Sequence, residues 1–364
     1  MKDPVEARAD ESEDLYDVTS WEPRSRLDRL AVKTHQGVLK AGRALLVALG
    51  VFILLLILGG GAAAAFFENP FILALVALSV VPAGLLAVYI YTTDITTDEP
   101  ASLLAMTFVL AVLFAGFAAI INTTFRGLFG VGAGGIVAVV GPVPGLQLLV
   151  MVLFYYLVVG PGEEAVKLLA VRLHAYRDSR FDSVIDGAVY GAVAGLGFAS
   201  IENVLYITQN ISGPSAVITQ TATDFAAAFL QTLDAGGEIT AVRSLAGPGH
   251  VIYSAFAGYY LGLAKFNPDN AGPIVAKGLL IAAFIHGTYN ILVGIVPVVI
   301  GALLPIPVFI IFVAFVVVYD GVFFYALYRK IARYRSAYAR VHDDIDDPED
   351  ADSELTEFDP DTNS

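Results

Sequence analysis

The sequence of 364 residues contains no cysteine, and only 15% of its residues are charged whereas 57% are hydrophobic. The absence of cysteine excludes structural disulfides, cysteine-ligated zinc and a thiol nucleophile, so any metal must be held by histidine and carboxylate side chains. The apolar residues form long blocks, a composition that is typical of a membrane protein. We therefore expect an all-α polytopic transmembrane helix bundle.

Eight segments carry the roughly 20 apolar residues that a helix needs to cross the hydrocarbon core. They run approximately over residues 44–66, 71–91, 101–121, 146–173, 183–208, 250–264, 274–295 and 299–327. The sixth is short, which allows an earlier start. We interpret the Gly- and Pro-interrupted stretch 127–145 as a re-entrant or interfacial segment, and residues 209–247 as one large outer loop.

The basic residues indicate the orientation, because Lys and Arg concentrate in cytoplasmic loops. An even number of crossings places most of them on one side, which predicts a multi-pass protein of the cell membrane with both termini cytoplasmic. The expected parts are an acidic then basic cytoplasmic segment at 1–43, a transmembrane domain at 44–328, and a basic then acidic cytoplasmic tail at 329–364. The glycosylation-type sequences at Asn122 and Asn210 both fall on the outer side.

Ionisable residues inside apolar segments are costly in lipid and therefore indicate function. Glu163, Glu164 and Lys167 lie near the middle of the fourth predicted span. Lys167 can neutralise one of the two glutamates on a shared helix face, which leaves the second carboxylate over. Such a pair can provide a general base, although a structural ion pair is an equal alternative. Pro161, just before the pair, should kink the helix.

The next three spans add further polar groups. In the fifth, a four-residue spacing predicts close helix packing at Gly187, Gly191 and Gly195. Glu202 lies two turns beyond and should face the same interior. His250 lies near the outer end of the sixth span, and His286 and Asn290 lie one turn apart in the seventh. Neutral imidazole can bind metal or accept a proton, so this set could activate water.

Each of these residues also has a purely structural interpretation. Glu202 and Asn290 could form hydrogen bonds between helices, and His250 could be an interfacial histidine. Asp320, in the last span, has no obvious partner in the sequence and is assigned no chemistry.

Four motifs in this order resemble the PrsW-type intramembrane proteases, relatives of the type II CAAX prenyl endopeptidases and of the APH-1-like membrane scaffold. The motifs are Glu163-Glu164-x-x-Lys167, Phe198-x-x-x-Glu202-Asn203, Arg243 seven residues before His250, and His286-x-x-x-Asn290. They cover about residues 145–295, which we therefore expect to be a protease-like core.

The resemblance implies an endopeptidase that hydrolyses membrane-embedded or membrane-anchored proteins within the lipid bilayer, with no nucleic-acid partner. Glu163 or Glu164 would activate water, Lys167 would tune the carboxylate pair, and Asn290 or backbone amides would stabilise the oxyanion. A divalent metal such as zinc would be held, or the water oriented, by Glu202, His250 and His286. The sequence permits a metalloprotease and a metal-free glutamate protease alike.

Two alternatives use the same residue types. A proton-coupled transporter also carries mid-membrane Glu, His and Lys, but it would predict an internal repeat between two halves, and we see none. A non-catalytic membrane scaffold of the same fold is the second alternative, and the sequence is compatible with it. The substrate, the cleavage position and the oligomeric state are not encoded in any motif that we recognise.

Overall fold

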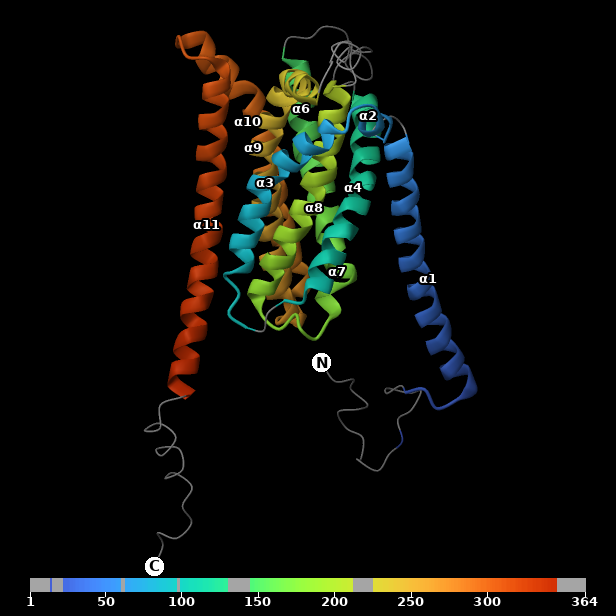
Figure 1. Cartoon of the computed structure of the whole chain (residues 1–364). Helices are drawn as coiled ribbons and strands as arrows, with labels where there is room; N and C mark the ends of the chain where they lie inside the picture. The colour runs from blue at the N-terminus through green and yellow to red at the C-terminus, as the bar shows by residue number, and fades with distance from the viewer. Residues whose placement is uncertain are drawn as a thin grey trace, which may run out of the picture. The chain divides into compact units, whose positions relative to one another are not determined.

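The computed structural model consists of helices joined by short connections over the residues that it describes, without any strand among them (Figure 1). Those residues are Asp14 and 22–59, 63–96, 99–129, 145–211 and 225–345. The acidic tails and most of the predicted re-entrant stretch lie outside them. Seven of the helices are long and apolar enough to cross a membrane. The prediction of an all-α polytopic bundle is therefore confirmed, and the chain is a multi-pass membrane protein.

The helices follow one another in the order labelled in Figure 1. They are α1 (Arg26–Ile57), α2 (Ala63–Glu68), α3 (Phe71–Tyr91), α4 (Ala101–Phe129), α6 (Leu146–Phe154), α7 (Gly160–Leu173), α8 (Val184–Ile211), α9 (Phe225–Lys265), α10 (Ala271–Leu303) and α11 (Val308–Ile345). A π-helical turn, Tyr155–Val159, joins α6 to α7, so that 146–173 forms one span. The chain divides into two compact units, Met1–Val51 and Phe52–Ser364, and the site described below belongs to the second.

The predicted and observed spans differ mainly at α9. Seven predicted spans correspond to the seven candidate membrane helices, whereas the sixth, 250–264, is the last part of the 41-residue α9, which is not among those seven. The prediction of an outer loop is wrong over residues 225–247, because these residues are helical. Asp234, Glu238 and Arg243 lower the hydropathy of this half of the helix, so an apolar-run criterion misses it.

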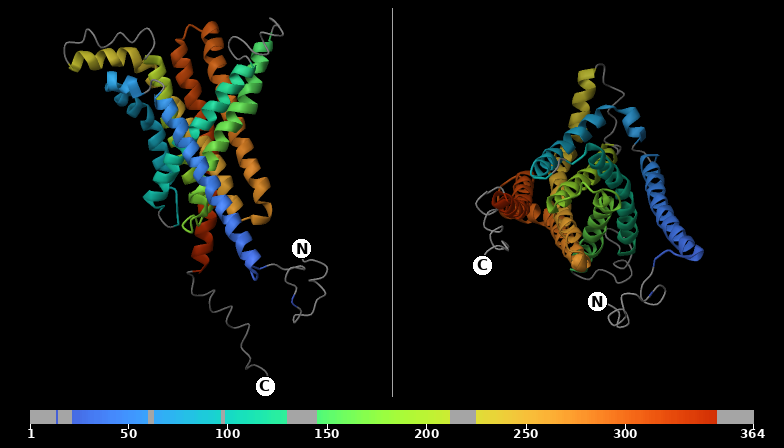
Figure 2. Two further views of the ribbon diagram at one scale, coloured as in Figure 1. Left: turned by 90° about the vertical axis from the view of Figure 1, so that its right-hand side faces the viewer. Right: turned by 90° about the horizontal axis from the view of Figure 1, so that it is seen from below.

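Helix α8 forms the centre of the second unit, packed among α3, α4, α7 and α9 (Figure 2). Of its most apolar 18-residue stretch, 83% is buried inside the protein, compared with 17% for α11. A helix that is enclosed in this way can carry polar side chains without exposing them to lipid. The fold therefore places Glu202, on α8, in the interior, as its sequence position predicts.

The predicted glycine spacing produces the contact between α8 and α9. A Cβ atom added at Gly191 would lie 2.3 Å from the carbonyl oxygen of Ser254, and one at Gly195 would lie 2.3 Å from that of His250. Only glycine lets the two backbones approach so closely. The seam thus fixes the position of the α9 segment that carries His250.

The span that carries Glu163 and Glu164 changes helical geometry just before them. The π-helical turn ends at Val159, and Gly160 then packs on α10, where an added Cβ atom would lie 2.5 Å from the carbonyl oxygen of Ala283. Pro161 occupies the first turn of α7, where proline is tolerated. The irregularity predicted near Pro161 is therefore a π-helical turn, a feature that is frequent at functional sites.

Candidate active site

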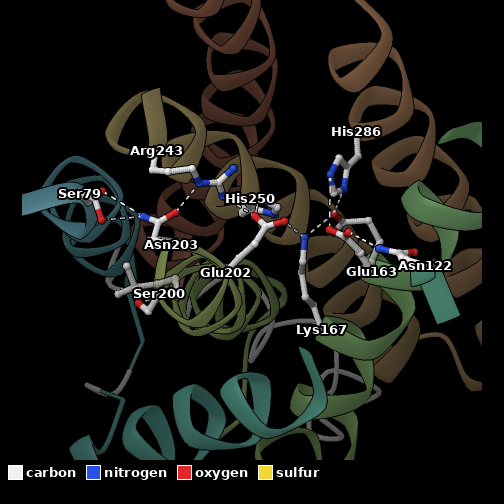
Figure 3. A network of polar contacts seen from close by, with 12 residues as sticks. Ser79, Asn122, Glu163, Lys167, Ser200, Glu202, Asn203, Arg243, His250 and His286 are labelled. Atoms are coloured by element: carbon white, nitrogen blue, oxygen red, sulfur yellow. Dashed lines mark hydrogen bonds and ion pairs between the residues drawn. The ribbon is translucent and has the colours of Figure 1, made fainter. Parts of the chain in front are cut away.

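A continuous network of polar side chains crosses the bundle (Figure 3). Its members, in order from α3 to α4, are Ser79, Asn203, Arg243, Glu202, His250, Lys167, Glu164, His286, Glu163 and Asn122. Six of the seven residues that the sequence predicts for the site belong to this network. The seventh, Asn290, lines the cavity beside it.

Glu164 is fully buried, and both of its carboxylate oxygens have partners. Its Oε1 accepts a hydrogen bond from Lys167 Nζ at 2.7 Å and lies 2.8 Å from His286 Nδ1. Its Oε2 accepts a hydrogen bond from Ser254 Oγ at 3.2 Å. Since a carboxylate only accepts, Nδ1 of His286 carries the proton, which leaves the lone pair on Nε2. Glu164 therefore orients His286.

Glu163 lies beside this pair but is only partly satisfied. Asn122 Nδ2 donates to its Oε1 at 2.9 Å. Its Oε2 is buried, lies 3.6 Å from His286 Nε2, and has no hydrogen-bond partner among the described residues. A buried carboxylate oxygen without a donor is costly, so this atom marks a position for a proton, a polarised water or a cation.

His250 connects the two ends of the network. Its Nδ1 lies 3.0 Å from Lys167 Nζ, and its Nε2 lies 2.9 Å from Glu202 Oε2. An ammonium group only donates, so Nδ1 accepts and Nε2–H donates to the carboxylate. The rings of His250 and His286 pack edge to face, with centroids 5.1 Å apart. Two imidazoles therefore lie side by side between Glu202 and Glu163.

Glu202 forms an ion pair that the sequence does not predict. Arg243 of α9 donates to Glu202 Oε2, and its Nε donates to Asn203 Oδ1 at 2.8 Å. Asn203 in turn donates to Ser79 Oγ at 3.0 Å. The positive charge of Arg243 compensates the negative charge of Glu202 inside the bundle.

A cavity of about 320 Å³ lies against this network. Among the residues that line it are Glu163, Glu202, Arg243, His250, Tyr253, His286 and Asn290. Glu164 and Lys167 are not part of the described lining, although the sequence predicts all seven site residues together. The residues that line the cavity can therefore contact a substrate, whereas Glu164 and Lys167 act through the residues that they hydrogen-bond.

Two contributors escape sequence reasoning. Asn122 lies in α4 and donates to Glu163, although its sequence context suggests an outer glycosylation site. Asp320 is not partnerless, since Tyr253 donates its hydroxyl hydrogen to it at 2.7 Å, and the Tyr253 ring packs 5.5 Å from that of His286. Tyr253 lies one helical turn after His250, a spacing that could have pointed to it.

Three of the residues fit a divalent metal. Glu163, His250 and His286 each offer a ligand atom within 4.8 Å of the others. Two imidazoles and a carboxylate form a set that suits catalytic zinc, whose ligands at about 2 Å lie roughly 3.4 Å apart. The 3.6 Å between Glu163 Oε2 and His286 Nε2 agrees with this spacing.

The set differs from the predicted one, because Glu163 joins the two histidines where the sequence suggests Glu202. Glu202 and Glu164 would instead be the carboxylates that orient the histidines. Ligation through Nδ1 of His250 would displace the hydrogen bond from Lys167.

Comparisons with known proteins identify the family of this chain. Residues 99–319 match the family described as "PrsW family intramembrane metalloprotease". Relatives named "Protease PrsW" are found in Bacillus subtilis (strain 168), 29% identical over 150 residues that form 41% of this chain and 57% of the relative, and in Geobacillus kaustophilus (strain HTA426), 30% identical over 129 residues that form 35% and 46%.

A third such relative, from Clostridioides difficile (strain 630), is 27% identical over 142 residues, 38% of this chain and 51% of the relative. The chain thus spans about half the length of the curated relatives it matches, and no solved structure matches it. The stretch that matches the family covers more than half of the chain and includes all seven predicted site residues. The chain therefore belongs to the PrsW family.

Proposed function

We propose that this protein is an intramembrane endopeptidase that hydrolyses peptide bonds of membrane-embedded or membrane-anchored proteins. The observation that carries the proposal is Glu163 Oε2, a buried carboxylate oxygen to which none of the described residues donates and which lies 3.6 Å from His286 Nε2. Both residues line the same cavity. A water molecule in the cavity beside Glu163 would have a proton acceptor next to it and would be shielded from lipid by the protein.

In a metal-free reaction, Glu163 is the general base. Its carboxylate takes a proton from water while the water oxygen attacks the carbonyl carbon of the scissile bond. Asn290, which lines the cavity, donates to the oxyanion. The protonated Glu163 then gives its proton to the leaving amine nitrogen. Glu164 and Lys167 act through His286 and His250, whose positions they fix.

In a metal-assisted reaction, Glu163 has a different role. Glu163, His250 and His286 would hold the divalent ion, zinc by the preference of this donor set, and the ion would lower the pKa of bound water. Glu164 would hold His286 with Nε2 directed at the site. The two versions therefore differ in whether Glu163 is a base or a ligand, and in whether activity survives removal of metal.

The proposed arrangement in the cell membrane follows the distribution of basic residues. Residues 44–328 would form the transmembrane domain, and the segments 1–43 and 329–364 would both be cytoplasmic. Arg172, in the last turn of α7, and Arg177 and Arg180, between α7 and α8, would then face the cytoplasm.

Glu163→Gln tests the proposal, because the amide keeps the size of the side chain but is not a base near neutral pH and is a much weaker metal ligand than a carboxylate. Membranes of the source cell are incubated with the reconstituted protein, and new peptide ends are detected by mass spectrometry. We expect wild type to produce such ends and Glu163→Gln to reduce their rate of appearance by at least about 100-fold. Glu238→Gln, an exposed change in α9, is the matched control and should cleave like wild type.

The same assay with a chelator separates the two versions of the mechanism. Loss of cleavage that zinc restores would support the metal-assisted version, and full cleavage after exhaustive chelation would support the metal-free version. If a folded Glu163→Gln protein cleaves like wild type, the assignment of this site is wrong. If wild type cleaves nothing, a scaffold that uses these ion pairs only for packing would replace the peptidase.

A further inference from the structure

Three carboxyl groups converge at the opposite end of α8 from Glu202. Asp94 and Glu99 lie in the connection between α3 and α4, and Asp186 lies in the first turn of α8. One oxygen from each lies within 4.8 Å of the others. Asp186 precedes Glu202 by 16 residues, about 24 Å along a helix, so this cluster is separate from the candidate active site.

Two oxygens of this cluster are buried without a donor. Glu99 is only 3% exposed, and its Oε1 has no hydrogen-bond partner in the described structure. The same holds for Asp94 Oδ2. The second oxygen of each group is occupied, since Tyr190 donates its hydroxyl hydrogen to Glu99 and the backbone N–H of Ile95 donates to Asp94 at 2.7 Å. The unsatisfied atoms therefore belong to carboxyl groups that are already fixed in place.

Asp186 accepts several hydrogen bonds at the start of α8. Its Oδ2 accepts hydrogen bonds from the backbone N–H groups of Asp182 at 2.7 Å and Ser183 at 2.9 Å, and Ser183 also donates through its hydroxyl. The positive end of the helix dipole favours a negative charge at this position. A carboxylate in this arrangement keeps lone pairs that can face a cation.

The described cations do not neutralise the cluster by direct contact. Lys265 is the lysine whose charge acts on both Asp186 and Glu99. Its Nζ donates to the backbone carbonyl oxygens of Asp178 at 3.0 Å and Phe181 at 2.7 Å, not to the carboxyl groups. Glu99 is buried, and a buried negative charge without a paired cation is costly. Negative charge in this place is thus unfavourable unless a positive charge joins it.

We propose that Asp94, Glu99 and Asp186 bind a hard divalent cation, Ca²⁺, which ties the connection between α3 and α4 to the first turn of α8. The donors are all oxygens, which suits Ca²⁺ and Mg²⁺ and disfavours zinc. Ca²⁺ accepts irregular oxygen cages, whereas Mg²⁺ requires near-octahedral geometry and keeps several waters, so a buried site built from a loop and a helix end favours Ca²⁺. The inference does not depend on the proposed peptidase activity.

The test is a thermal unfolding experiment on the full-length protein in nanodiscs of neutral phospholipid. After chelation and removal of the chelator, Ca²⁺ is titrated. We expect saturating Ca²⁺ to raise the midpoint of wild type by about 5 °C or more. Glu99→Gln and Asp94→Asn should abolish the rise, because each replaces a negatively charged carboxylate of the site with a neutral amide.

Two control variants separate this site from other acidic positions. Asp269→Asn, an exposed change, and Glu163→Gln, in the candidate active site, should both keep the wild-type rise. Terbium provides a direct readout, since Tyr190 is hydrogen-bonded to Glu99 and can sensitise a bound Tb³⁺. We expect tyrosine-excited emission that Ca²⁺ displaces and that Glu99→Gln reduces.

Three results would overturn the proposal. A wild-type midpoint that does not respond to Ca²⁺ would leave Glu99 and Asp186 as a carboxyl pair that shares a proton. A rise of equal size in Glu99→Gln and wild type would place the cation elsewhere, for example on the acidic tails. A rise with Mg²⁺ but not with Ca²⁺ would refute calcium as the ion.

Discussion

The polar network has two halves that differ in how completely their carboxylates are paired. We call Glu202, Asn203, Arg243 and His250 the α8–α9 half, and Glu163, Glu164, Lys167 and His286 the α7–α10 half. The α8–α9 half contains one carboxylate, which has an arginine and an imidazole as partners. The α7–α10 half contains two carboxylates and a single lysine, so one negative charge is left over.

This difference in pairing shows that the depth of a carboxylate in the membrane does not by itself tell whether the carboxylate is reactive. Glu163 and Glu164 are adjacent, 4% and 0% exposed, and are carried by the same helix. Both oxygens of Glu164 have donors, whereas Glu163 keeps an oxygen to which no residue in the described part of the chain donates. Reactivity is therefore expected where pairing is incomplete, and positioning where it is complete.

The largest expected effect comes from removing the single cation of the α7–α10 half. Lys167→Met leaves the buried carboxylate of Glu164 without its charge partner. Breaking a buried ion pair from one side typically lowers the free energy of unfolding by about 3–5 kcal/mol. We expect a loss of this size in a reversible detergent unfolding titration, because no other described cation donates to Glu164.

A double variant sharpens this prediction. Lys167→Met combined with Glu164→Gln removes both charges, so most of the lost stability should return. Lys277→Met, at an exposed position of α10, is the matched control and should change the free energy of unfolding by less than about 1 kcal/mol. A double variant as unstable as Lys167→Met would show that the pair is not the source of the effect.

A smaller effect is expected at the seam that carries the α8–α9 half. In Gly191→Ala the new Cβ atom would lie 2.3 Å from the carbonyl oxygen of Ser254, so the helices must separate. We expect the free energy of unfolding to fall by about 1–3 kcal/mol, as for other overpacked sites. Cleavage should slow as well, because Ser254 donates to Glu164.

Gly294→Ala is the control for the seam. It is also helical, but an added Cβ atom there meets nothing within 4 Å, so stability should be unchanged or slightly higher. Equal losses at Gly191 and Gly294 would mean that helix propensity, not the close approach of α8 and α9, sets the effect.

Much of the fold and of the site could be predicted because the membrane simplifies the physics. Apolar runs predict helices directly, and the cost of charge in lipid is enough to single out Glu163, Glu164, Lys167, Glu202 and His286 by their sequence positions. The glycine spacing around Gly191 predicts the close contact with a neighbouring helix.

The rest depends on which side chain reaches which atom, and composition does not encode it. Arg243 lies in a stretch whose polar residues mimic a loop, so its helix and its pairing with Glu202 stay hidden. Asn122 and Asp320 each act through a partner on another helix, and that contact between distant segments has no local signal. Sequence therefore predicts the inventory of the site but not the division between paired and unpaired carboxylates.

The smallest expected effect lies at the far end of the α8–α9 half. Ser79→Ala removes the hydroxyl that accepts a hydrogen bond from Asn203 at 3.0 Å, and about 1 kcal/mol of stability should be lost. Arg243 keeps both of its partners, so the rate of cleavage and its pH profile should be unchanged. Ser336→Ala, at an exposed position of α11, is the matched control. A changed pH profile in Ser79→Ala alone would mean that proton affinity is transmitted along the whole network, and the two halves would then have to be treated as one catalytic unit.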